Sequence, residues 1–352
     1  MQLKRVQLKR VLQIAAITAI TVLFLYLFLR NANLGDVWGI LKSTSLLWLS
    51  IGLVVNFCAL LFRTARWRTI LDPDAPPPLY ATFFATTVGF MLSTVLPIRG
   101  ADIARPVLLA RRTNFRFSGA LGTVLVERML DLTSILLLFV IFAFLRWNEF
   151  SHNRWFTIVR SGAIAAAILL VVMISFVTGL AFFRGFVRRM HEWLGRLLPQ
   201  RFRESWMHFF DTFVETLKLA RHRAALIKVL ACTVGVWLCL TAQFWFATMA
   251  LHRPLPFDSS FFITGVTTIG LAIPTPGGVG GFHKACQLVL TNFYRFDVDS
   301  SVAVAVVFHV IGTLPVVVTG LLLFAHEGLR WRDLERPHSQ GEEHSAEQEV
   351  DG

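Results

Sequence analysis

Two apolar stretches of this chain are interrupted by proline and glycine where a membrane-spanning helix would be deepest in the bilayer. The first, residues 86–105, contains Pro97 and Gly100. The second, residues 267–283, contains Pro274, Pro276, Gly277, Gly278, Gly280 and Gly281. A broken helix at membrane depth is tolerated only where protein or a water-filled cavity covers the freed backbone groups. A pair of such segments at corresponding places in two halves indicates a transport site.

The composition indicates a membrane protein. Of the 352 residues, 55% are hydrophobic, and the mean hydropathy is +0.60, whereas soluble domains are about 45–50% apolar. The net charge is +12, but no soluble stretch is long enough for a nucleic-acid-binding domain. We therefore expect membrane lipids with anionic headgroups, and not nucleic acid, to be the partners of the basic residues.

Six apolar runs are long enough, or nearly so, to cross a hydrocarbon core, which takes about 20 helical residues. They are 11–29, 46–62, 118–145, 162–183, 225–251 and 301–325. The broken segments, 79–110 and 257–296, lie between them. The sequence thus predicts an all-α polytopic membrane protein with about six full spans and two re-entrant hairpins broken by proline and glycine. Eight spans are the alternative.

Basic residues favour the hairpin interpretation. One cluster, Arg63 to Arg68, precedes the first broken segment, and another, Arg111 to Arg116, follows it. Both clusters lie on the cytoplasmic side, as the positive-inside rule requires, only if the segment enters the membrane and returns. Both termini are then cytoplasmic. The first run follows Lys4, Arg5, Lys9 and Arg10 and has no small-residue cleavage site after it, so we interpret it as a retained anchor.

The same topology predicts an inverted repeat. Residues 11–145 and residues 162–325 both have the order span, span, hairpin, span, but they start on opposite sides of the membrane. The echo of residues 86–89 (T-T-V-G) in residues 267–270 (T-T-I-G) agrees with this arrangement. One transmembrane domain, residues 1–325, is expected to precede a polar cytoplasmic tail, residues 326–352, that we expect to be disordered.

Residues 184–223 have an amphipathic pattern, with apolar residues at helical spacing and arginines on the other face. This pattern is typical of helices that lie on the cytoplasmic leaflet. A helical hairpin packed on the bundle is the alternative.

Ionisable residues inside membrane segments are costly and are candidates for function. Arg99 and Arg105 flank Asp102 beside the first break, where a helix N-terminus freed near Gly100 would add backbone N–H groups. Arginine offers a planar set of donors that suits phosphate or carboxylate. These residues therefore predict a site for an anionic headgroup. An internal Arg–Asp pair that closes the hairpin is the alternative.

Three more charged residues, Glu127, Arg128 and Asp131, lie near the start of the third span. Glu127 and Asp131 are four residues apart and share a helix face, and Glu127 is placed to pair with Arg99 or Arg105. The alternative is that Arg128 extends to the membrane interface. The predicted substrate-binding residues are Arg99, Asp102, Arg105, Glu127, Arg128 and Asp131.

The second broken segment is interpreted as part of the gate, together with two histidines. The predicted hairpin and gating residues are Pro97, Gly100, Pro274, Pro276, Gly277, Gly278, Gly280, His283 and His309. The histidines are candidate proton carriers or buried hydrogen-bonded side chains. We expect no metal site, because the histidines have no fixed ligand spacing. We also expect no cofactor and no catalytic residue, because no catalytic motif is present.

Three motifs resemble the lysylphosphatidylglycerol synthase transmembrane family, also called the flippase-like domain family. Residues 97–105 (P-I-R-G-A-D-I-A-R) resemble its P-x-R-x-G-E-x-x-R segment. Residues 127–131 (E-R-M-L-D) resemble its E-R-x-x-D helix, and residues 274–280 (P-T-P-G-G-V-G) resemble its P-x-P-G-G-x-G hairpin. The resemblance covers about residues 10–325 and implies movement of a lipid between leaflets.

This sequence departs from the family pattern at three places. Ala101-Asp102 stands for the usual Gly-Glu, His283 for a usual Glu, and His309 for a usual Arg. The two histidines are a candidate coupled exchange that keeps their positions paired. The full-length synthases add a cytoplasmic aminoacyl-transfer domain, and we expect that activity to be absent because this chain ends soon after its last span.

The sequence therefore predicts a flippase for an anionic phospholipid or lipid-linked substrate in the bacterial plasma (inner) membrane. Two alternatives are a membrane-embedded enzyme that modifies a lipid headgroup and a non-transporting accessory subunit of an envelope enzyme. A homodimer or an envelope-enzyme complex is the expected assembly.

Overall fold

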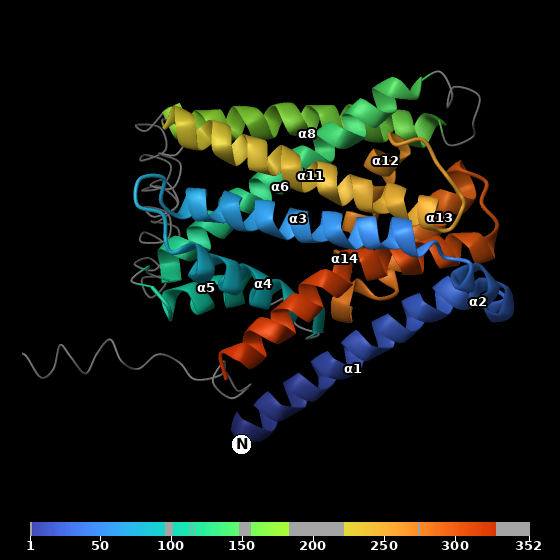
Figure 1. The fold of residues 1–352 in the computed structure, drawn as a ribbon, viewed down its shortest axis with the longest axis horizontal. Helices are drawn as coiled ribbons and strands as arrows, with labels where there is room; N and C mark the ends of the chain where they lie inside the picture. The colour runs from blue at the N-terminus through green and yellow to red at the C-terminus, as the bar shows by residue number, and fades with distance from the viewer. Residues whose placement is uncertain are drawn as a thin grey trace, which may run out of the picture.

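The computed structural model of the chain describes residues 2–95, 101–113, 115, 117–147, 156–182, 222–273 and 275–328, which are helical or loop and form no strand. The first half contains α1 (Gln2–Leu29), α2 (Leu34–Lys42), α3 (Leu46–Leu71), α4 (Leu79–Val95), α5 (Ala101–Ala110) and α6 (Phe117–Leu145). The second half contains α8 (Phe156–Phe182), α11 (Arg223–Ala250), α12 (Ser259–Gly270), the 3₁₀ turn η2 (Pro276–Gly278), α13 (Gly281–Phe293) and α14 (Val298–His326) (Figure 1).

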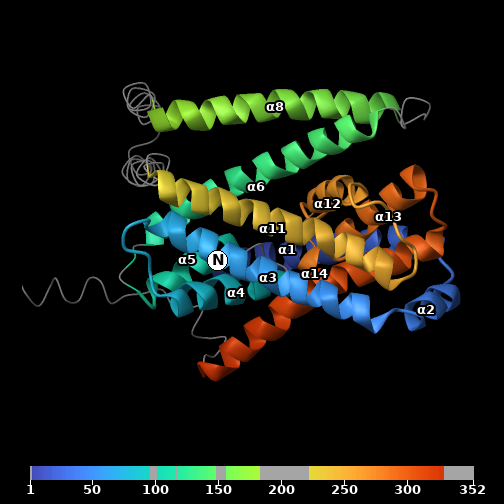
Figure 2. The same cartoon turned by 45° about the horizontal axis from the view of Figure 1, so that its top comes forward.

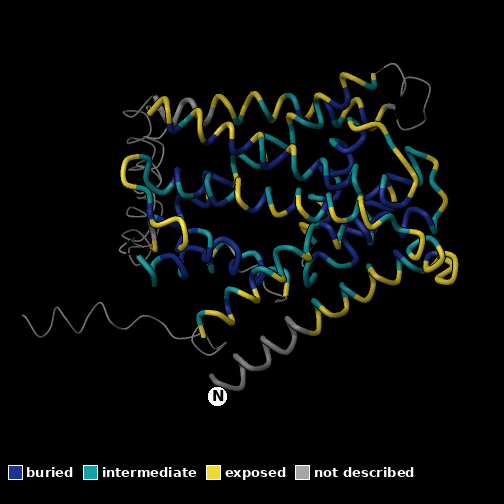
Figure 3. The backbone as a smooth tube through the Cα atoms, viewed as in Figure 1, coloured by how far each residue is buried: buried dark blue, intermediate teal, exposed yellow. Residues whose placement is uncertain are grey.

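Within the described ranges, five helices are long and apolar enough to cross a membrane: α3, α6, α8, α11 and α14. The pair α1 and α2 makes a sixth span if its two bent parts are counted together. Large apolar side chains are exposed on the outer faces, as at Ile168 and Val171 of α8, and Figure 3 shows exposed residues along α1 and α8. The all-α polytopic fold class is confirmed.

The helix α2 is an element that the apolar runs did not indicate. It has nine residues and bends away from the apolar part of α1 by 80°. The side chain of Asn33 accepts a hydrogen bond from the backbone N–H of Gly35 at 3.0 Å and so caps the start of α2. This cap satisfies a backbone donor that the helix itself leaves unpaired.

The helix α3 is longer than the apolar run 46–62 indicated, and this corrects the interpretation of its arginines. It continues to Leu71, so that Arg63 and Arg66 lie inside the helix and not in a cytoplasmic loop. Arg66 is buried. Two arginines of the basic cluster from which we inferred the topology therefore belong to the helix bundle and not to a loop.

Each broken segment forms a hairpin of two packed helices, as the sequence predicted. The first consists of α4 and α5, and the second of α12 and α13. At 1.5 Å per residue, the 17 residues of α4 are roughly 25 Å long, less than the ~30 Å hydrocarbon core. Figures 1 and 2 show the two hairpins at opposite ends of the long axis of the molecule.

The two halves have a common register. The helix α6 is Phe117–Leu145 and α14 is Val298–His326, so one offset in numbering relates position 117 to 298 and position 145 to 326. We call it the repeat offset, and it also relates Gly89 to Gly270. The packing is reciprocal, because α3 lies along α11, the hairpin helix α4 contacts α14, and the hairpin helix α12 contacts α6. The related helices run in opposite directions in Figure 1, as in the predicted inverted repeat.

An ion pair at each end of the molecule ties the last span of one half to the hairpin of the other half. Arg146, after α6, pairs with Asp258, the residue before α12, with Nη2 2.7 Å from Oδ1. Glu327, after α14, pairs with Arg112, after α5, with Nη2 2.9 Å from Oε2. The repeat offset relates positions 146 and 327 as well. We call these two ion pairs the end clamps.

The core has two main parts, one around α12–α14 and one around α4 and α5. The predicted amphipathic segment, up to residue 221, and the predicted polar tail from residue 329 onward lie outside the described residues.

Candidate functional site

Glu127 of α6 is the centre of a buried ion network. Its Oε1 lies 3.2 Å from Nε of Arg66, and its Oε2 lies 2.8 Å from Nη2 of Arg105. These three side chains are at most 3% exposed. A buried charge left without a partner is strongly destabilising, so the network fixes α3 and α5 against α6. The predicted pairing of Glu127 with Arg105 is thus present, and the other predicted partner, Arg99, lies outside the described residues.

Arg105 is held in place by its neighbours. Its Cζ lies 4.3 Å from the ring centroid of Trp67, in a cation–π contact. Its aliphatic stem passes over Gly89 of α4, where a Cβ atom would lie 2.3 Å from Cγ of Arg105. A glycine at position 89 is therefore required for the arginine to reach Glu127.

Asp102 and Arg128 form a second, more accessible pair. Nη2 of Arg128 is 2.6 Å from Oδ1 of Asp102, and Nη1 of Arg128 is 3.3 Å from Oδ2 of Asp131. Asp131 also accepts a hydrogen bond from Arg66 at 2.8 Å. Because the side chains of Arg128 and Asp102 are 42% and 48% exposed, this pair is able to exchange one partner for a ligand.

Arg63 of α3 is the cation of this region without an acidic partner among the described residues. Its Cζ lies 4.8 Å from the ring centroid of Phe90, and its buried Nε has no hydrogen-bond acceptor. Four arginines therefore face three carboxylates in the described part of the cluster: Arg63, Arg66, Arg105 and Arg128 against Asp102, Glu127 and Asp131. The formal excess is one positive charge.

Sequence reasoning missed Arg63 and Arg66. It placed them in a flanking loop because the apolar run stops at residue 62. A helical span takes about 20 residues, and the run 46–62 is shorter than that. The length of the run was therefore a signal that the helix continues through both arginines.

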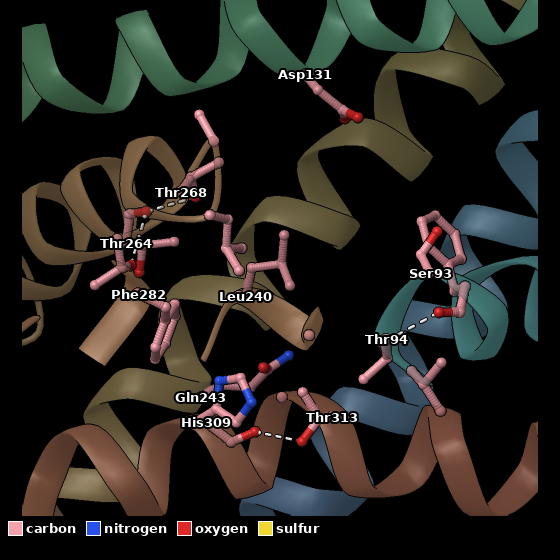
Figure 4. Close-up of a pocket in the computed structure, with 18 of the residues that line it drawn as sticks. Ser93, Thr94, Asp131, Leu240, Gln243, Thr264, Thr268, Phe282, His309 and Thr313 are labelled. Carbon is pink, nitrogen blue, oxygen red and sulfur yellow. Dashed lines mark hydrogen bonds between the residues drawn. The ribbon is translucent and has the colours of Figure 1, made fainter. Parts of the chain in front are cut away.

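A cavity of about 600 Å³ lies between the two hairpins. Such a volume is in the usual range for small-ligand sites. Its charged wall is formed by Arg63, Asp102, Arg128 and Asp131. Figure 4 shows Asp131 on one side of the cavity, and Gln243 and His309 on the other.

The tip of the second hairpin meets the end of α4 beside this cavity. Gly277 has φ +57°, and a Cβ atom there would lie 3.0 Å from the backbone oxygen of Thr94 in α4. Gly280 has φ +91°, and its Cβ would lie 2.8 Å from Cβ of Phe24 in α1. Only glycine combines a positive φ with such close approach at low cost. The predicted gating glycines thus allow the second tip to contact both α4 and α1.

The two predicted histidines contact each other. The ring centroids of His283 and His309 are 4.6 Å apart. The backbone N–H of Gly280 donates to Nδ1 of His283 at 3.4 Å, and His309 lines the cavity. The repeat offset relates Asp102 to His283 and Arg128 to His309, so an imidazole pair replaces the ion pair. By the same offset, buried Cys286 and Phe308 replace Arg105 and Glu127.

The structure thus brings together Asp102, Arg105, Glu127, Arg128 and Asp131 in one cluster, and His283 with His309 in another. Pro276, Gly277, Gly278 and Gly280 lie at the second tip. Four of the predicted site residues lie outside the described residues: Pro97, Arg99, Gly100 and Pro274. In the described ranges, no three His, Cys, Asp or Glu side chains are grouped as ligands for a metal ion.

Long apolar spans around two opposed hairpins, with a charged cavity between them, define a multi-pass membrane protein built as an inverted repeat. Residues 12–320 match the family described as Lysylphosphatidylglycerol synthase TM region, and the chain belongs to that family. It is also similar to a UPF0104 membrane protein of Methanocaldococcus jannaschii, with 23% identity over 234 residues, which are 66% of this chain and 92% of the relative. The family connects the chain with lipid biology.

Proposed function

We propose that this protein moves an anionic lipid between the two leaflets of a membrane. The observation that carries the proposal is Arg63, a cation on the wall of a cavity of about 600 Å³ that pairs with no carboxylate of the described residues. Charged groups at membrane depth are costly and mark substrate pathways. A cation without an acidic partner is therefore a binding group for an anion.

The chemistry of the charged wall suits a phosphate. Arginine presents several N–H donors in a plane and binds phosphate oxygens through charge-assisted hydrogen bonds. Arg128 also lines the cavity, and its pairing with half-exposed Asp102 allows phosphate to replace the carboxylate. Asp102 then returns to Arg128 when the lipid leaves.

The fold offers a way to expose the cavity to either side. The hairpins lie at opposite ends of the bundle, and the tip of the second meets the end of α4 beside the cavity. Withdrawal of one tip would open the cavity toward one end, and withdrawal of the other tip toward the opposite end. Alternating access of this kind is common in transporters built from inverted repeats.

Two further parts of the proposal concern the remaining predicted arginines and the location of the protein. Arg105 acts from behind the cavity wall, because it is buried against Phe90 and Trp67, and Arg99 stays a predicted phosphate ligand. We place the protein in the bacterial plasma membrane with both termini in the cytoplasm, in agreement with the basic residues of its expected inner segments.

Exchange of a fluorescent anionic phospholipid in vesicles that hold only this protein tests the proposal. We expect Arg63→Gln to slow exchange by about tenfold, the effect of losing one charged hydrogen bond. Arg160→Gln, an exposed position on α8, is the matched control and should exchange at the wild-type rate. An unchanged rate in folded Arg63→Gln protein contradicts the proposal, and a chemically altered lipid would favour an enzyme.

A further inference from the structure

Part of the cavity lining is uncharged and has a chemistry of its own. It includes Trp237 and Gln243 of α11, Thr264 of α12, and His309 of α14. We call these four residues the neutral pole. Figure 4 shows Gln243 and His309 beside each other and Thr264 across from Asp131.

Several polar atoms of the neutral pole have no partner in the protein. Nε1 of Trp237, Nε2 of Gln243 and Oγ1 of Thr264 are buried and make no hydrogen bond to a described residue. Buried polar groups are nearly always hydrogen-bonded, and a donor left without an acceptor costs free energy. The three residues that carry these groups all line the cavity, so a side-chain rotation toward the cavity would let a ligand or ordered water complete them.

The neutral pole holds no pair of opposite charges. The repeat offset places His283 and His309 where the first half has Asp102 and Arg128, and Phe308 where it has Glu127. The two imidazole rings touch, with centroids 4.6 Å apart, and neither ring forms an ion pair with a carboxylate of the described residues. Two adjacent imidazolium ions would repel each other, so the pole favours neutral ligand groups.

We propose that the neutral pole binds a hydroxyl-bearing headgroup, a sugar or a cyclic polyol, of the same lipid whose phosphate is bound at Arg63. This inference rests on the proposed function. Hydroxyl groups donate and accept hydrogen bonds, and the neutral pole offers both donors and acceptors: indole and amide N–H groups, a hydroxyl, an amide oxygen and imidazole nitrogens. Trp237 and Gln243 are six residues apart, or about 9 Å along α11, which suits a six-membered ring with its hydroxyls.

Other headgroups fit this side less well. An ammonium group would find no carboxylate among the four residues of the neutral pole, and a second phosphate would find no arginine. A ligand with phosphate alone would leave the three unpartnered atoms as they are. The neutral pole thus selects among anionic lipids by the neutral part of the headgroup.

Binding of two lipids to the purified full chain tests the inference. Phosphatidylinositol carries a phosphate and a cyclic polyol, and phosphatidic acid carries the phosphate only. In native mass spectrometry of the detergent-solubilised protein, we expect phosphatidylinositol to bind more tightly. Gln243→Leu and Thr264→Val should each reduce this preference about five-fold, the effect of one neutral hydrogen bond. Neither should change binding of phosphatidic acid.

Thr241→Val is the matched control. Thr241 is buried on α11 two residues from Gln243, and its hydroxyl bonds the helix carbonyl of Trp237, so the preference should persist in this variant. Equal binding of the two lipids by the wild type, or a preference that survives both pole variants, overturns the inference, as expected if water alone completes these donors. A preference for phosphatidylinositol without leaflet exchange of either lipid would instead reject the proposed function, whereas the inferred binding at the neutral pole would still hold.

Discussion

At the scale of single residues, the site depends on positions that lack a side chain as much as on those that have one. Gly89 makes room for Arg105. Its counterpart by the repeat offset, Gly270, makes room for α13, where a Cβ at position 270 would lie 2.8 Å from Cβ of Ala285. The similarity of the sequences T-T-V-G and T-T-I-G therefore has a physical cause. Each glycine lies where the two arms of a hairpin cross closely.

We expect Gly89→Ala to lower the stability by roughly 1–3 kcal/mol, because the added methyl group displaces the stem of Arg105 from a packed site. Gly39→Ala is the matched control. Gly39 lies in α2 with no atom within 4 Å of an added Cβ, and the change should be neutral or slightly stabilising. Thermal unfolding in detergent measures both. Equal melting temperatures for Gly89→Ala and the wild type would show that the arginine does not need this space.

The sequence indicated part of the charged cluster and missed another part for an identifiable reason. Asp102, Arg105 and Glu127 stand out because they are charges beside a broken apolar segment. Arg63 and Arg66 follow an apolar run and resemble an ordinary basic flank. A hydropathy scale treats each arginine as too costly to bury in the membrane. In the folded protein, the pairing of Arg66 with Glu127 and Asp131 offsets that cost. The partners become visible only after α3 and α6 are packed.

At the scale of elements, each hairpin is attached at its base by an end clamp. Glu327 accepts hydrogen bonds from Nη1 of Arg112 at 3.1 Å and from the hydroxyl of Tyr80 at 2.6 Å. These donors, Arg112 first, lower the pKa of Glu327 from 4.5 to about 2. The clamp joins the end of α14 to both helices of the first hairpin, so its protonation weakens that attachment.

The pH dependence of this clamp follows from the direction of the shift. Because the pKa of Glu327 is lower in the folded protein, its contribution to stability is present above pH 4.5 and is lost as the pH falls toward about 2. We expect Glu327→Gln to melt below the wild type at neutral pH and the difference to shrink through this window. Asp36→Asn, exposed on α2, is the control. A difference that stays constant from pH 7 to pH 3 would argue against the clamp.

The hairpins themselves were predictable, because proline and glycine break an apolar run whatever its neighbours are. The helix α2 was not, because its nine residues are too few for a clear periodic pattern. The close contact of Gly277 with Thr94 was also beyond the sequence. The two residues lie in different halves of the chain, so their contact depends on how the folded halves pack together.

At the scale of the whole molecule, the inverted repeat is symmetric in framework and asymmetric in chemistry. The helices α6 and α14 correspond end to end, yet the first half carries the ion network and the second half carries the histidine pair. Charge counting predicted the inverted order of the spans, since basic residues report on sidedness. It did not indicate that the two halves would carry such different side chains at corresponding positions.

The proposed function requires the tip of the second hairpin to separate from the end of α4 for a lipid to cross. A Cβ atom at position 277 would lie 3.5 Å from Cγ2 of Thr94, so cysteine side chains at these two positions would touch, as a disulfide requires. Cysteines at 94 and 277, in a protein freed of its four native cysteines, should therefore cross-link on oxidation. The left-handed backbone at position 277 adds roughly 1–2 kcal/mol of strain, which the matched single-cysteine variants control for.

Leaflet exchange by this double-cysteine protein in vesicles, before and after reduction, is the most direct test. We predict that the oxidised protein stops exchanging anionic lipid, that reduction restores exchange, and that the single-cysteine variants respond to neither treatment. Full exchange by a protein shown to be cross-linked would contradict the account.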